Sequence, residues 1–143
     1  MYMLDTNIII YSMRHGDSEC AKRLETHSGN DTCISVVTLG ELEFGIRNSS
    51  DPERNRYAVE QILSGIPVLD FDRKAAVHFG AILAEMKRKN RYDVYRDRDK
   101  MIAAHARSLG CVLVTDNIRD FSDVSDLMLA NWREPDGFSP AVR

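Results

Sequence analysis

The segment that most constrains the fold is residues 111–115, which read Cys-Val-Leu-Val-Thr. It is apolar on both faces of the strand it would form, and it follows directly on Gly110, a residue type that often ends helices. Strands buried on both faces are typical of the interior of parallel sheets, and parallel strands need a crossover connection, usually a helix. A chain with such a strand is therefore expected to fold as an α/β domain.

Short apolar runs and helical segments alternate along the rest of the chain, as this fold class requires. Strands are predicted at residues 1–4, 32–35, 66–69 and 111–115. Helices are predicted at residues 7–14, 18–27, 36–47, 52–63, 73–89 and 99–109, with N-caps at Asp17, Ser35, Asp51 and Asp72. The stretch containing Leu127, Met128 and Trp132 should return to the body as a short strand or loop. Together these elements predict a central, mostly parallel sheet flanked by helices, a three-layer α/β/α fold.

Length and composition exclude several classes of protein. The chain has 143 residues, 43% of them hydrophobic and 29% charged, which is ordinary for one folded domain. We expect that domain to span residues 1–134, with a flexible tail at residues 135–143. No apolar run approaches the ~20 residues of a membrane span, and the N-terminus does not resemble a secretory signal. Three scattered cysteines argue against a disulfide framework and fit a reducing, cytoplasmic location.

The charge is unevenly distributed. The formal net charge is −3, yet residues 85–107 carry a net +4 and residues 116–143 a net −3. A basic segment can serve a polyanionic partner, because lysine and arginine displace counterions from phosphates, but a solvated helix end has the same composition. Tyr92 and Tyr95 lie in this segment and are predicted either to stack on bases, to cover the core or to bind a partner.

Acidic and amide side chains lie where a parallel sheet gathers its functional residues. Asp5 follows the first strand directly, Asp116 and Asn117 follow the strand at 111–115, and Asp99 opens the preceding helix. The carboxyl ends of parallel strands share one edge, so these side chains are expected to converge there. Glu41 lies within a predicted helix that is apolar almost all round, which predicts a buried helix and a carboxylate in need of a partner or a cation.

Carboxylates gathered in this way predict a divalent metal site. Close carboxylates repel one another and raise one another's pKa unless a cation neutralises them. Oxygen ligands without cysteine or paired histidine favour Mg²⁺ or Mn²⁺ over zinc. Such a centre typically activates water for attack on a phosphodiester and stabilises charge on the scissile phosphate.

Four short motifs then resemble the PIN-domain ribonucleases, and among them the VapC toxins of bacterial toxin–antitoxin pairs. The motifs are Met-Leu-Asp-Thr-Asn-Ile at residues 3–8, Thr-Leu-Gly-Glu-Leu at 38–42 with Gly45, Asp-Lys-Met-Ile-Ala-Ala at 99–104, and Val-Thr-Asp-Asn at 114–117 with Phe121. Each motif is weak alone, but all four in this order are specific. The resemblance runs from Met3 to about Trp132, and it implies a PIN-like fold.

The resemblance also implies roles for individual residues. Asp5 and Asp99 would ligate the metal directly, and Glu41 would do so directly or through water. The fourth position would be Asn117 or the neighbouring Asp116, which the sequence does not separate. Thr6, Asn7 and Thr115 would orient these groups by hydrogen bonds. The charged loop at residues 93–98 departs from the family pattern and adds Asp93 and Asp97 as rival acids. Asp99 is preferred because it stands at the position of the motif's aspartate relative to the Ile-Ala-Ala sequence that follows.

The function that the resemblance implies is a Mg²⁺-dependent endoribonuclease, with Mn²⁺ as a substitute, acting as a toxin. It would cut RNA, with the anticodon loop of transfer RNA as the suspected site. Its partners would be a VapB-type antitoxin and a second copy of the chain in a homodimer, with higher-order toxin–antitoxin complexes also expected and no membrane. The alternative is a catalytically inactive PIN-like module that binds RNA or protein.

Overall fold

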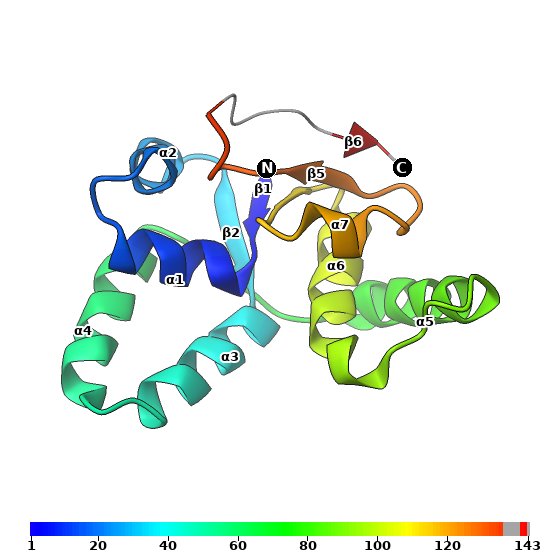
Figure 1. Cartoon of the computed structure of the whole chain (residues 1–143), viewed down its shortest axis with the longest axis horizontal. Coiled ribbons are helices and arrows are strands. Elements are labelled where there is room, and N and C mark those ends of the chain that lie inside the picture. Colours follow the sequence, from blue (N-terminus) through cyan, green and yellow to red (C-terminus); the bar gives the residue numbers. More distant parts are fainter. Residues whose placement is uncertain (136–140, 143) are drawn as a thin grey trace.

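The computed structural model describes residues 1–135 and 141–142, and its framework is one six-stranded sheet. Figure 1 shows its strands between the helices. The strands are β1 (Tyr2–Leu4), β2 (Thr32–Ser35), β3 (Val68–Leu69), β4 (Val112–Val114), β5 (Met128–Ala130) and β6 (Ala141–Val142), in the spatial order β3-β2-β1-β4-β5-β6. The first five are parallel and β6 is antiparallel to β5. The α/β class predicted from residues 111–115 is confirmed, with β4 between β1 and β5.

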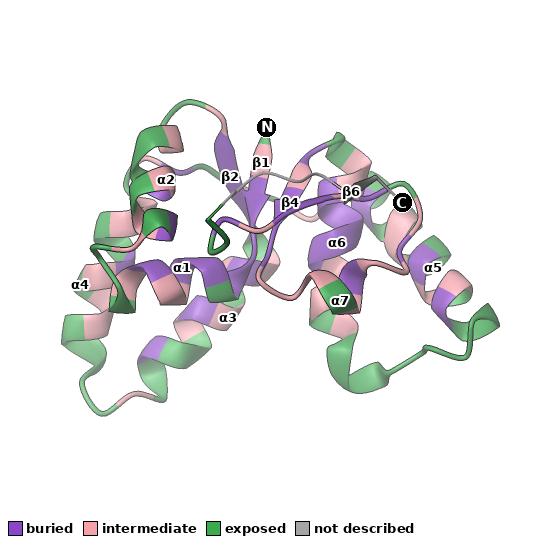
Figure 2. Cartoon of the chain, turned by 45° about the horizontal axis from the view of Figure 1, so that its top comes forward, coloured by how far each residue is buried: buried purple, intermediate pink, exposed green. Residues whose placement is uncertain are grey.

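Helices cover both faces of the sheet. They are α1 (Thr6–Arg14), α2 (Glu19–His27), α3 (Val36–Arg47), α4 (Pro52–Leu63), α5 (Arg73–Arg88), α6 (Asp97–Leu109) and α7 (Ile118–Phe121), with a 3₁₀ turn η1 (Val94–Arg96) before α6. Figure 1 shows α1–α4 on one side of the strands and α5 with α6 on the other. Figure 2 shows buried strands between partly exposed helices.

The core follows from the alternation of side chains along the strands. Met3 and Leu113 pack in a cluster with α5, α6 and α7, whereas their neighbours Leu4 and Val114 pack in a second cluster with α1–α4. Successive residues of a strand point to opposite faces, so each short apolar strand contributes side chains to both clusters. Removing this apolar surface from water on both faces stabilises the three layers together.

Three details of the predicted helices were wrong. Ser18, not Asp17, caps α2, because its side chain accepts a hydrogen bond from the backbone of Ala21. Helix α6 begins at Asp97, so Asp99 lies inside its first turn and is not its cap. Helix α3 is not buried all round: Phe44 is 65% exposed. Neighbouring elements bury only part of the helix surface, so some of its apolar side chains, such as Phe44, face solvent. The short helix α7 and the turn η1 were not predicted.

Open parallel sheets typically form a crevice where the strand order reverses, and in this sheet that point lies beside Asp5. The chain moves outward from β1 through β2 to β3, then returns to the other side of β1 with β4. The connections after β1 and β4 therefore lead to opposite sides, which leaves an opening at the carboxyl ends of these neighbours. Asp5 follows β1 there, and Thr115 follows β4. The described residues include no helix long and apolar enough to cross a membrane.

The segment after β5 is held against α2 by one side chain. The Arg23 guanidinium donates to the backbone carbonyls of Trp132, Glu134 and Pro135 at 2.7, 2.8 and 2.8 Å. The Trp132 ring is buried and stacks on His27 with ring centroids 5.0 Å apart. Of the tail predicted at 135–143, residues 136–140 and 143 lie outside the described residues, while Ala141–Val142 pairs with β5.

We expect Arg23→Met to lower the free energy of unfolding by about 1–2 kcal/mol, because three carbonyls lose their donor while the apolar stem is kept. Urea denaturation would measure the loss. Lys22→Met removes a neighbouring charge whose ion pair with Glu19 is exposed, so it should change stability by less than about 0.5 kcal/mol. Equal losses in the two variants would contradict the anchoring role of Arg23.

Candidate active site

Asp5 is a buried carboxylate fixed by two hydrogen bonds. It caps α1, where Oδ1 accepts from the backbone N–H of Thr6 at 2.8 Å. Its Oδ2 accepts from the Thr115 hydroxyl at 2.9 Å, which links the ends of β1 and β4. The residue is 4% exposed. The predicted orienting roles of Thr6 and Thr115 match these contacts, whereas Asn7 is exposed and makes no side-chain hydrogen bond within residues 1–135.

The environment of Asp5 disfavours its charge. Burial, with smaller contributions from the nearby Asp99 and Glu41 carboxylates, raises the pKa of Asp5 from 3.8 to about 6, although the hydrogen bonds from Thr115 and Thr6 oppose the shift. Burial also raises the pKa of Asp99, with Glu41 and Asp120 adding to the effect. The acids at the crevice are therefore close enough to sense one another's charge, as predicted for Asp5, Glu41 and Asp99.

Glu41 reaches this cluster from α3. Its Oε1 accepts a hydrogen bond from the Thr6 hydroxyl at 2.7 Å, and its Oε2 lies 3.5 Å from Nε of Arg98. The side chain of Glu41 is 20% exposed, so it is partly open to solvent and is not enclosed in the core. Thr6 thus connects the helix that follows Asp5 to the carboxylate of Glu41.

The fourth position involves an acid that the motifs did not single out. Nδ2 of Asn117 donates to Oδ2 of Asp120 at 2.6 Å, and Arg96 forms an ion pair with the same oxygen. Asp120 raises the pKa of Asp99, so its carboxylate belongs to the cluster. The spacing from Asn117 to Asp120, three residues at the start of a short helix, is the sequence signal that could have indicated it.

Asp116 is held away from these acids. Its Oδ2 pairs with Nη1 of Arg133 at 2.7 Å, and the Arg133 guanidinium stacks over the Tyr11 ring at 3.8 Å from the ring centroid. Of the two candidates that the sequence left open, the structure brings Asn117 toward Asp99 through Asp120 and ties Asp116 to Arg133.

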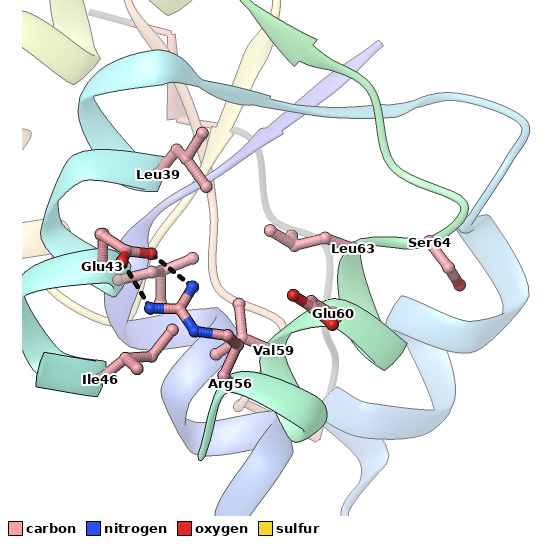
Figure 3. A pocket seen from close by; sticks show the side chains of 9 residues that line it. Leu39, Glu43, Ile46, Arg56, Val59, Glu60, Leu63 and Ser64 are labelled. Atoms are coloured by element: carbon pink, nitrogen blue, oxygen red, sulfur yellow. Dashed lines mark hydrogen bonds and ion pairs between the residues drawn. The ribbon is translucent and has the colours of Figure 1, made fainter. Parts of the chain in front are cut away.

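A hollow between α3 and α4 is separate from the acid cluster. Figure 3 shows Glu43 turned toward Arg56 there, with Oε1 2.6 Å from Nη2 of the arginine. Hydrogen bonds from Arg56 and Arg47 hold the pKa of Glu43 down to about 2. The hollow has a volume of about 240 Å³, and neither Asp5 nor Asp99 lines it. Glu43 is therefore a surface ion-pair partner, two residues from Glu41 in sequence but not part of the same site.

The donor set of the cluster fits a hard divalent cation. Its ligands would be carboxylate oxygens, and the raised pKa values of Asp5 and Asp99 mean that burial and neighbouring acids disfavour their negative charges, which a bound cation would offset. Within the described residues, no three Asp, Glu, His or Cys side chains come close enough to hold an ion by themselves.

Comparisons with known proteins agree with this geometry. The PIN-domain family model matches residues 2–127. The ribonuclease VapC2 of Haemophilus influenzae is 41% identical and the tRNA(fMet)-specific endonuclease VapC of Shigella flexneri is 43% identical, each match covering 92% of this chain and 97% of the relative. Among solved structures, the DNA-bound VapBC of Salmonella typhimurium matches with a TM-score of 0.84 at 39% identity, over 92% of this chain and 97% of that one.

A second solved structure gives the same result. VapBC2 of Rickettsia felis, bound to a DNA fragment from its promoter, matches with a TM-score of 0.84 at 32% identity and covers 92% of this chain and 98% of that chain. The similarity extends over nearly the full length of these relatives, and the family model covers most of the chain. The chain belongs to the PIN-domain family and, within it, to the VapC ribonucleases.

Proposed function

We propose that this chain is an endoribonuclease that depends on Mg²⁺, with Mn²⁺ as a substitute, and acts as the toxin of a VapBC-type pair. The observation that carries the proposal is that Thr6 donates to both Asp5 and Glu41, from its backbone N–H and its hydroxyl, with Asp99 near enough to raise the pKa of Asp5. Asp5 and Asp99 would hold the ion directly, and Glu41 would do so directly or through water. When bound, the ion supplies an activated water and neutralises charge on the scissile phosphate.

The residues of the chain prepare this chemistry by fixing the carboxylates. Thr115 and the N-terminus of α1 hold both oxygens of Asp5, so its carboxylate keeps one orientation. The Thr6 hydroxyl holds Glu41, and Asn117 holds Asp120. Groups that orient metal ligands typically change activity about 10- to 100-fold when removed. With a pKa of about 6, Asp5 is mainly ionised at pH 7 despite its burial.

The proposed substrate is a transfer RNA, cut in its anticodon loop. Support comes from the Shigella flexneri relative, which is named a tRNA(fMet)-specific endonuclease and is 43% identical. An exposed loop is also the physically accessible target, because the A-form stem hides its base edges in a deep, narrow groove.

The proposed partners are a VapB-type antitoxin and a second copy of this chain, in a cytoplasmic complex. The solved structures of similar chains are VapBC complexes, two of them bound to DNA. An antitoxin segment with a basic side chain would suit the acid cluster, because a guanidinium forms strong charge-assisted hydrogen bonds with carboxylates.

The test is to incubate the purified chain with total transfer RNA in Mg²⁺, in Mn²⁺ and in EDTA, and to sequence the fragments. We expect cleavage within anticodon loops in either metal and none in EDTA. Cleavage that persists in EDTA would overturn the metal dependence. RNA that is retained but stays intact in both metals would instead support the inactive binding module.

A further inference from the structure

A second, smaller cavity adjoins the acid cluster. It lies where the end of α5, the turn η1 and the first turn of α6 face α7, and its volume is about 200 Å³. Its lining residues are Met86, Arg91, Asp93, Arg96, Lys100 and Asp120. Asp120 also belongs to the acid cluster, so the cavity and the cluster share a wall. Three cations and two anions therefore surround a space beside the proposed centre of cleavage.

Lys100 is a buried cation with unused hydrogen-bond donors. It is 7% exposed, its Nζ donates to the backbone carbonyl of Asp120 at 2.9 Å, and it lies 5.1 Å from the centroid of the Phe121 ring. That carbonyl is its one hydrogen-bond partner among residues 1–135 and 141–142, which leaves two of its three N–H donors. A buried ammonium is stabilised by acceptors, and anionic oxygens are the strongest of them.

The two acids of the cavity wall already have partners. Oδ1 of Asp93 accepts from the backbone N–H of Tyr95 at 3.0 Å, and its Oδ2 lies 3.5 Å from Nε of Arg96. Asp120 is held by Asn117 and Arg96.

Arg91, by contrast, makes one ion pair within the described part of the chain, with Asp123 at 3.0 Å, and a guanidinium has five donors. The segment from Lys89 to Arg96 is exposed, so an extended chain can approach from solvent. The cavity thus offers more free donors than free acceptors.

We propose that this cavity binds a phosphate group of the RNA backbone adjacent to the one that is cut, with Lys100 and Arg91 donating to its oxygens. The inference rests on the proposed function and adds a positioning site to it. A polynucleotide that reaches Asp99 carries further phosphates on both sides of the cleaved bond. One of them can enter the cavity on the far side of Asp120, where its negative charge would lie near the ammonium of Lys100, the residue that directly follows Asp99 in α6.

The test measures binding of a single-stranded RNA oligonucleotide to the full chain in EDTA, where cleavage is not needed, by fluorescence anisotropy at several salt concentrations. We expect Lys100→Gln and Arg91→Gln each to weaken binding about tenfold, since each removes a charged hydrogen bond. Each should also lower the slope of log affinity against log salt by about 0.7, the value for one phosphate contact on a single strand.

The matched controls are Lys74→Gln and Arg73→Gln, which remove the same charges from the exposed first turn of α5, at the other end of that helix. They should change affinity by less than about twofold and leave the salt slope unchanged. Equal losses in all four variants would show general electrostatic attraction and overturn the site. A loss in Lys100→Gln together with a lower melting temperature, with Arg91→Gln unchanged, would also overturn it, because the loss would then come from misfolding.

A competition arm identifies the source of the phosphate. Inorganic phosphate is titrated at constant ionic strength against the bound RNA. If the Lys100 and Arg91 variants lose affinity for inorganic phosphate but not for RNA, the cavity serves a free anion and the RNA assignment is overturned. If the wild type cleaves RNA but the Lys100 and Arg91 variants bind RNA as well as the control variants do, this inference alone is overturned. If the Lys100 and Arg91 variants lose RNA binding but the wild type does not cleave RNA, the proposed nuclease is overturned and the phosphate site stands.

Discussion

Asp5→Asn is expected to abolish RNA cleavage while making the folded protein more stable above pH 6. The carboxylate is the proposed direct ligand, so its loss should lower the cleavage rate by more than about 100-fold, beyond the effect of removing an orienting group. The asparagine keeps the local contacts, because its oxygen can accept from the Thr6 backbone and its amide can donate to the Thr115 hydroxyl. The cleavage assay in Mg²⁺ measures the first effect.

The stability effect follows from the pKa of Asp5, which is raised from 3.8 to about 6 in the folded protein. A carboxyl with a raised pKa contributes stability that is fully present below pH 3.8 and is lost as the pH rises through 6. Without divalent cation, the free energy of unfolding of the wild type should therefore fall by roughly 2 kcal/mol relative to Asp5→Asn between pH 4 and pH 7.

Urea denaturation in EDTA at both pH values would measure this difference, with Asp17→Asn, an exposed site, as the control. A variant that cuts RNA at the wild-type rate would refute the ligand role. A stability difference that does not change with pH would refute the account of Asp5 as a buried carboxylate with a disfavoured charge.

Asp120→Asn should lower the cleavage rate about 10- to 100-fold, whereas Asp116→Asn should leave it within about twofold. The Asp120 carboxylate raises the pKa of Asp99 and accepts a hydrogen bond from Asn117, whereas the Asp116 carboxylate forms an ion pair with Arg133 at the surface. The two changes are chemically identical and only four residues apart, so each serves as the control for the other.

Both variants are to be compared in the same cleavage assay, with the melting temperature recorded beside it. Loss of the exposed Asp116–Arg133 pair should cost less than about 1 kcal/mol. The reverse order of activities, with Asp116→Asn the more damaging change, would show that the fourth position is the acid directly after Thr115.

The local sequence predicted the elements well wherever one physical cause dominated. The strand at residues 111–115 and the helix from Pro52, with Asp51 as its cap, follow from apolar runs and capping side chains that act over a few residues. Asp5 could be placed at the end of the first strand for the same reason. Errors occurred where two candidates compete locally, as with Asp17 and Ser18 at the start of α2. There, packing decides which residue takes the capping geometry.

The sequence by itself determined the α/β alternation and the position of Asp5 at the end of β1, because strand burial, helix periodicity and capping are short-range properties. Only the tertiary structure decided that Asp120 joins Asp99 while Asp116 turns to Arg133, and that Lys100 lines a cavity. The direction of a side chain after a strand depends on the turn that follows and on partners far away in sequence. No local pattern encodes those partners, since they meet only when the helices pack on both faces of the sheet.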